Sequence, residues 1–299
     1  MAKVSYLLVV IFGFILFNSC SNHQKIETTP RQSVAATPGS HMQKSYGAYL
    51  AGRIAHQRKN FNTAADYYIQ ALNQDPDNQN LRSQIYVILA SRGRIEEAAR
   101  YAKESLKKGD KNNITYIIIA VEDMKQGNYA QTLQTINKLD GPIYKEFINP
   151  LIKAWAYAGK NQPDKALKEL SIISKEPSFR ALYNFHAGMI NDYFDRTDAA
   201  RRHYEVIVNE ESLEMSFRAL QIITNFYIRS GQQDKAVALV NKYSDDKLMV
   251  DMLNKLANNV RRATPAETKK IITTPQLGLS EALSAKASAV SAISTSPSA

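Results

Sequence analysis

The 299-residue sequence predicts an all-α protein built from about six helical hairpins and a capping helix. The first observation is a repeat, because a small residue recurs every 34 residues, with one spacing of 36, at Ala64, Ala98, Thr132, Ala166, Ala200 and Ala236. The second is that several of these positions follow a glycine, where a first helix would end. The third is that 12 glycines and 10 prolines are too few for a turn-rich β-sandwich. Such a period marks units that stack to form one core.

Residues 1–20 are predicted to be a signal peptide. Lys3 precedes an apolar run from Val4 to Phe17, which is short for a membrane-spanning helix and has the length of a secretory h-region. Cys20, the only cysteine in the chain, follows shortly after this run. The segment resembles a bacterial lipoprotein signal, in which a lipidated cysteine follows the h-region, although Phe17 stands where that family usually has leucine. Lipidation of Cys20 would anchor the protein to a membrane.

Two other interpretations of the N-terminus stay open. Ser19 and Ser21 could form the −3 and −1 positions of a plain secretory cleavage site. The apolar run could also be an uncleaved anchor, for which it is short. If Cys20 is lipidated, the resemblance favours the outer membrane, because Ser21 stands where inner-membrane lipoproteins of well-studied families carry aspartate.

Two segments outside the repeats are predicted to lack a fold of their own. Residues 21–44 form a polar tether with two prolines. Residues 263–299 form a disordered tail, whose last 16 residues contain six serines and five alanines. Within this tail, "LGLSEAL" looks like the opening of another repeat that does not complete.

The repeats are predicted to occupy residues 45–262. The recurring small residues, together with Gly52 and Gly188, are expected to let the two helices of a hairpin approach closely. A left-handed residue is expected to end the first helix of each hairpin. This turn position is held by Gly93, Gly127 and Gly231, and in the other repeats by Lys59, Asn161 and Asp195. After the sixth repeat, a capping helix is expected to place Leu248, Met252 and Leu256 on one face.

The repeats resemble the tetratricopeptide repeat (TPR), whose pattern combines small residues at close helix crossings with aromatic residues and a final helix breaker. In that register, "GRIAHQRKNFNTAADYYIQALNQDP" supplies Gly52, Phe61, Ala64, Tyr68 and Pro76. The resemblance covers residues 45 to about 250 and implies a right-handed α-solenoid. It also implies a concave groove that is lined by the first helix of each hairpin.

The expected groove is apolar in its middle and binds a protein or peptide partner. Transferring the family's groove positions gives Tyr49, Arg53, Val87, Ile117, Val121, Met124, Leu151, Trp155, Phe185, Met189 and Tyr193, followed by the polar Arg218, Asn225 and Arg229. Such a surface suits an amphipathic helix or an extended apolar segment. Two alternatives stay open: curvature buries these side chains between neighbouring repeats, or the chain's own "IITTPQLGLSEAL" folds back into the groove.

No constellation of residues indicates catalysis. The five histidines lie far apart, and none forms the i, i+4 pair that holds a metal ion on a helix. No glycine-rich phosphate loop follows a strand, and no second cysteine is present. We therefore expect no enzyme activity, no metal, no cofactor and no small-molecule substrate.

The net charge of +10 leaves a second function open. Scattered basic residues can be solvated helix faces, or they can bind anionic envelope polymers such as peptidoglycan or lipopolysaccharide. Nucleic acid is not expected, because an exported protein rarely meets it. The leading prediction is a protein-binding scaffold that is membrane-anchored and faces the periplasm of a bacterial cell.

Overall fold

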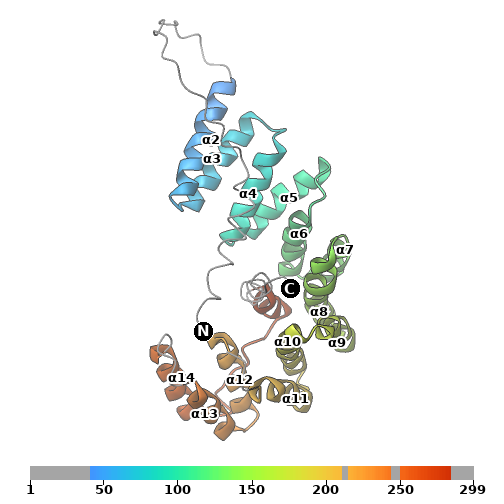
Figure 1. The fold of residues 1–299 in the computed structure, drawn as a ribbon, viewed down its shortest axis with the longest axis vertical. Coiled ribbons are helices and arrows are strands. Elements are labelled where there is room, and N and C mark those ends of the chain that lie inside the picture. Colours follow the sequence, from blue (N-terminus) through green and yellow to red (C-terminus); the bar gives the residue numbers. More distant parts are fainter. Residues whose placement is uncertain (1–40, 211–214, 244–249, 284–299) are drawn as a thin grey trace, which may run out of the picture. The chain divides into compact units, whose positions relative to one another are not determined.

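A computed structural model describes residues 41–210, 215–243 and 250–283, and the regular structure within these ranges is entirely helical. Consecutive helices pack in pairs, so the prediction of an all-α chain of stacked hairpins is confirmed. The described residues divide into two compact units after Gln126. Figure 1 shows their helices, coloured in sequence order. Cys20, the signal segment and residues 21–40 of the expected tether lie outside the described residues. None of the described helices is both long and apolar enough to cross a membrane.

Unit 1 covers described residues 41–126. It contains α2 (His41–Gln57), α3 (Phe61–Gln74), α4 (Gln79–Ser91), α5 (Ile95–Lys107) and α6 (Asn113–Lys125). Helices α2 and α3 form one hairpin, α4 and α5 form the next, and α6 packs on α5. Asparagine side chains cap the N-termini of α4 and α6. The side-chain oxygens of Asn78 and Asn112 each accept a hydrogen bond from the backbone N–H three residues later.

Unit 2 covers described residues 127–283. Its α-helices are α7 (Tyr129–Ile136), α8 (Asn149–Gly159), α9 (Pro163–Leu170), α10 (Arg180–Tyr193), α11 (Thr197–Val208), α12 (Phe217–Arg229), α13 (Gln233–Lys242) and α14 (Val250–Arg262). Shorter turns are the π-helical Tyr144–Ile148 and the 3-10 helices Ser171–Lys175 and Pro177–Phe179. The hairpins are α8–α9, α10–α11 and α12–α13, and α14 packs on α13 and α12.

The small residues of the repeat lie at tightly packed positions. Ala64, Ala98, Thr132, Ala166, Ala200 and Ala236 all have an exposed fraction of 0%. A Cβ atom added to Gly52 would lie 2.5 Å from the ring of Tyr68, and one added to Gly188 would lie 2.5 Å from the ring of Tyr204. These aromatic side chains occupy the space that glycine leaves between the two helices of a hairpin.

The turn position is left-handed in all six repeats. Its φ angles are 77°, 78° and 72° at Gly93, Gly127 and Gly231, and 59°, 57° and 57° at Lys59, Asn161 and Asp195. In the Lys59 turn, the backbone N–H of Asn60 donates to the carbonyl of Ala55 at 2.9 Å, as in a Schellman motif. The same bond recurs at 2.9 Å from Arg196 to Asn191. At the Gly93 turn the backbone N–H of Arg94 donates to the carbonyl of Leu89 at 2.9 Å, so the turn is the same with or without glycine.

The C-terminal part of the chain differs from the sequence prediction in two ways. Helix α14 buries Leu253 and Val260, whereas Met252 is 47% exposed and Leu248 lies outside the described residues. Residues 263–283, which we expected to belong to a disordered tail, are ordered here, and residues 275–283 form a helix. The prediction was wrong for this part because its apolar side chains are buried within unit 2. The serine- and alanine-rich composition of the residues that follow had suggested that the whole tail lacks a core.

Candidate functional site

The predicted groove positions of unit 2 lie on α8, α10 and α12, the first helices of its three hairpins. We call this surface the groove face. Trp155 and Met189 are 0% exposed and Leu151 is 3% exposed, while Phe185 and Tyr193 are half-buried. The apolar middle of the expected groove is therefore covered and is not open to solvent.

Trp155 is covered by the chain's own C-terminal residues. Gly278 lies so close that an added Cβ atom would be 2.2 Å from the indole ring of Trp155. The indole N–H points elsewhere, because Trp155 Nε1 donates to His186 Nδ1 at 3.2 Å. Burial lowers the pKa of His186 to about 3, so its ring is neutral near pH 7 and can accept this bond.

The polar end of the groove face binds the same stretch of chain. Arg218 donates through Nε to Oε1 of Glu281 at 2.8 Å, and only 10% of the Glu281 side chain is exposed. Asn225 Nδ2 donates to the backbone carbonyl of Lys269 at 2.9 Å. Arg229 Nε in turn donates to Asn225 Oδ1 at 3.0 Å and so holds the Asn225 side chain. Charge and amide groups on α12 thus hold both a side chain and the backbone of the segment.

A lysine fixes the start of this segment at the carboxyl end of α10. Lys270 Nζ donates to the backbone carbonyl of Asp192 at 2.7 Å and to Oδ1 of Asp195 at 2.7 Å. A cation at this end of a helix is favoured, because the last carbonyls carry partial negative charge. Farther along, Gln276 Nε2 donates to the hydroxyl of Tyr129 on α7 at 3.2 Å.

Residues 269–283, which we call the C-terminal segment, therefore occupy the groove face of unit 2. Buried apolar residues complete the contact, with Ile272, Leu279 and Ala282 exposed by 2–3%. Of the alternatives left open by the sequence, this arrangement corresponds to the fold-back of "IITTPQLGLSEAL". That a partner binds through the predicted groove residues stays a prediction.

In unit 1 the predicted groove positions have less cover. Arg53 is exposed, and Val87, Ile117 and Val121 are half-buried, whereas Met124 is 0% exposed. Tyr49 packs inside its own hairpin, with its ring centroid 5.8 Å from that of Tyr68.

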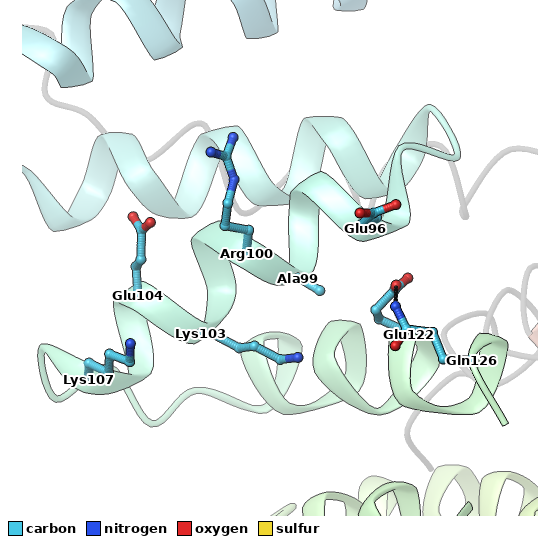
Figure 2. A pocket seen from close by; sticks show the side chains of 8 residues that line it. All are labelled: Glu96, Ala99, Arg100, Lys103, Glu104, Lys107, Glu122 and Gln126. Carbon is cyan, nitrogen blue, oxygen red and sulfur yellow. Dashed lines mark hydrogen bonds between the residues drawn. The ribbon is translucent and has the colours of Figure 1, made fainter. Parts of the chain in front are cut away.

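A charged pocket of about 340 Å³ lies between α5 and α6 (Figure 2). Its lining alternates in sign, with Glu96, Glu104 and Glu122 against Arg100, Lys103 and Lys107. Glu122 is buried and accepts a hydrogen bond from Gln126, while its second oxygen has no partner among the described residues. The balanced charges give no preference for an anion or a cation, so the pocket indicates no particular ligand.

The described histidine and acidic side chains do not gather into a metal site. Among the described residues, no group of three or more histidine, cysteine or acidic side chains could hold a metal ion. His186 is enclosed beside Trp155, and His203 Nδ1 pairs with Asn184 Oδ1 at 2.9 Å. Both histidines therefore bond to side chains within unit 2.

The sequence placed Trp155, Arg218 and Asn225 at groove positions and left the fold-back of "IITTPQLGLSEAL" open as one alternative, but it identified no pair of residues in contact. Lys270, Gly278 and Glu281 gave only weak signals, as part of a short segment near a low-complexity tail. The glycine inside the apolar run "LGLSEAL" was the one available hint, because such a glycine often marks a close approach.

Comparison with solved structures identifies the fold. No protein-family model and no curated protein matches the sequence. PilW, a type IV pilus biogenesis factor, superposes with a TM-score of 0.53 at 14% identity, over 72% of this chain and 98% of PilW. A tetratricopeptide repeat protein from Parabacteroides merdae ATCC 43184 superposes with a TM-score of 0.55 at 13% identity, over 82% of this chain and 99% of its own. The chain has the TPR fold. At these identities the likeness extends to the fold alone.

Proposed function

We propose that the protein is a non-catalytic scaffold whose groove face in unit 2 binds a polypeptide segment of a partner protein. The observation that supports this most is that the face already holds a polypeptide, the C-terminal segment. Asn225 bonds to its backbone, Arg218 bonds to a side chain, and Trp155 packs against a glycine. A surface with apolar anchors and a few polar groups at its edge has the chemistry that recognises a short helix or extended segment.

We further propose that the scaffold works at the bacterial cell envelope, anchored through a lipid on Cys20. The support comes from the apolar run that precedes this lone cysteine and from the polar residues that follow it. The structural likeness to PilW, a type IV pilus biogenesis factor, is compatible with this location.

Photo-cross-linking tests the binding face. A photo-reactive amino acid at Tyr193 of the groove face should capture a partner in cells that express the full chain. The matched control is Val206 on α11, the second helix of the same hairpin, which is 47% exposed and should capture nothing specific. The same captured species from both positions, or capture from Val206 alone, would contradict a groove-bound partner.

Salt separates this function from binding to an anionic polymer. Contacts between exposed charges weaken steeply as ionic strength rises, whereas apolar packing persists. We expect capture at Tyr193 to survive 0.5 M salt, and loss of capture at that salt would favour the polymer.

The anchor has its own test. The mature protein extracted from membranes should have an intact mass that corresponds to a chain beginning at triacylated Cys20. A mass that corresponds to a chain beginning at Asn22 would instead indicate plain secretion.

A further inference from the structure

Within unit 2, the C-terminal segment contacts the groove face in the manner of a ligand. Its contacts reach Trp155 on α8 and Arg218 on α12, the positions that line the groove in a hairpin array. The connection that leads to it is exposed at residues 264–267, immediately after α14. The connection itself therefore adds few contacts, so the segment can leave the groove face while α14 stays packed.

At the centre of the face that release would uncover, the Trp155 indole has its hydrogen bond without the segment. Trp155 Nε1 already donates to His186, so the indole needs nothing from the segment except apolar contact. Release would expose the Trp155 ring together with the places now filled by Ile272 and Leu279. An apolar patch of this kind favours exchange of one polypeptide for another over an empty face.

Three residues define what the face accepts. A base at position 270 reaches the carboxyl end of α10, and an acid at position 281 pairs with Arg218. Between them, position 278 must be glycine, because even a methyl group would lie 2.2 Å from the Trp155 ring. The helix around it begins at Pro275, with Thr274 Oγ1 accepting a hydrogen bond from the N–H of Leu277 at 3.2 Å.

We propose that the C-terminal segment is a built-in competitor, and that the partner segment displaces it by presenting the same features. The partner then carries a basic residue, a glycine eight positions later in a short helix, and an acidic residue three positions after that glycine. This inference rests on the proposed function, because it names the chemistry of the partner for the same face.

Tryptophan fluorescence of the full chain tests whether the C-terminal segment covers the groove face, because Trp155 is the only tryptophan. Gly278→Leu should lift the segment, shift the emission to longer wavelength and open Trp155 to acrylamide quenching. The matched control Leu277→Ala alters a 39% exposed side chain of the same helix and should change neither. An emission in Gly278→Leu that stays as shielded as in the wild type would overturn the proposal.

A synthetic peptide of residues 266–283 then supplies the ligand in trans. Added to the Gly278→Leu protein, it should reverse the emission shift in a saturable way. The same peptide carrying Gly278→Leu should not bind. Equal binding of both peptides, or binding of neither, would contradict recognition through the glycine. A dimer in which one copy's segment shields Trp155 of another would make a second copy the occupant and overturn the proposed partner.

Exchanging the charges of Arg218 and Glu281 provides a second test in case Gly278→Leu disturbs the fold. Glu281→Arg should expose Trp155, because it places two cations together at Arg218. The double variant Arg218→Glu, Glu281→Arg should reseat the segment and shield Trp155 again. Failure of the double variant to restore the emission would show that this pair does not select the occupant.

Partner capture separates this inference from the proposed function. A competitor seated nine-tenths of the time lowers apparent affinity about tenfold, so Gly278→Leu should raise capture at Tyr193 up to about tenfold. Equal capture by wild type and variant would overturn the competitor and leave the scaffold function standing. Capture by neither would overturn the scaffold function, and the peptide experiment would still decide whether the face recognises the segment.

Discussion

The two units are built from the same hairpin but differ in what covers their groove positions. In unit 2, Trp155 and Met189 are 0% exposed, and the C-terminal segment lies against the Trp155 ring. In unit 1, Val87 and Val121 are only half-buried, and the first helix leaves Tyr46, Leu50 and Ile54 exposed by 51–62%. The repeat thus fixes how helices pack within a hairpin, while the occupant of the groove depends on residues outside the repeat.

The largest predicted effect concerns what the units share. Gly52→Ala in unit 1 and Gly188→Ala in unit 2 each place a Cβ atom 2.5 Å from a tyrosine ring. Overpacking of this kind should lower the free energy of unfolding of the affected unit by up to about 3 kcal/mol. Hydrogen exchange measured on peptides from each unit should show faster exchange in the mutated unit alone.

This pair also measures how independent the units are. If Gly52→Ala speeds exchange in residues 127–243 as strongly as in residues 46–126, the units unfold together and the comparison between them does not hold. Gly47→Ala is a control, because an added Cβ atom at Gly47 meets nothing within 4 Å.

A second prediction uses the buried histidine that only unit 2 has among the described residues. His186 is 0% exposed and burial lowers its pKa to about 3, whereas His56 in unit 1 is half-buried with a pKa that is lowered from 6.5. In the unfolded chain His186 therefore binds a proton as the pH falls through 6.5, whereas in the folded chain it stays neutral. Neutral His186 therefore contributes to the free energy of unfolding of unit 2, and this contribution is fully present above pH 6.5. It is lost as the pH falls toward 3, by about 2 kcal/mol at pH 5.

The variant His186→Gln isolates this contribution. Glutamine keeps an acceptor for Trp155 Nε1 but does not titrate, so unit 2 of the variant should lose less stability between pH 7 and pH 5. Denaturant unfolding followed by Trp155 emission measures this, since unit 1 has no tryptophan. An unchanged pH slope in the variant would assign the acid sensitivity to other groups, such as half-buried His203.

The hairpins could be predicted because the residues that determine their packing lie close together in the sequence. A small residue and its aromatic neighbour are separated by 16 positions at Gly52 and Tyr68 and again at Gly188 and Tyr204. The left-handed turn also follows from spacing, which places Lys59 and Asp195 in register with glycines, and their φ angles of 59° and 57° agree with this. Repetition made both patterns visible.

The fold-back of the C-terminal segment could be raised as an alternative but not decided from the sequence, because its contacts are unique and distant in sequence. Lys270 bonds to Asp192, 78 positions away, and Gln276 bonds to Tyr129, 147 positions away. Neither pair repeats, so no spacing pointed to it. The sequence could place Trp155 on the groove face, but its cover depends on the absence of a side chain at Gly278.

The smallest predicted effect compares equivalent turns of the two units. Lys59 has a left-handed φ of 59°, which costs a side-chain-bearing residue about 1 kcal/mol, so Lys59→Gly should stabilise unit 1 by up to that amount. Asp195→Gly relieves less strain, because aspartate tolerates this conformation better. It also removes the Oδ1 atom that accepts a hydrogen bond from Lys270 at 2.7 Å, so unit 2 should gain nothing and Trp155 should become easier to quench. Unit-resolved hydrogen exchange and acrylamide quenching measure both effects. Equal stabilisation of the two units with unchanged quenching would mean that Asp195 plays no part in holding the segment, and the difference between the units would then rest on Gly278 and Glu281.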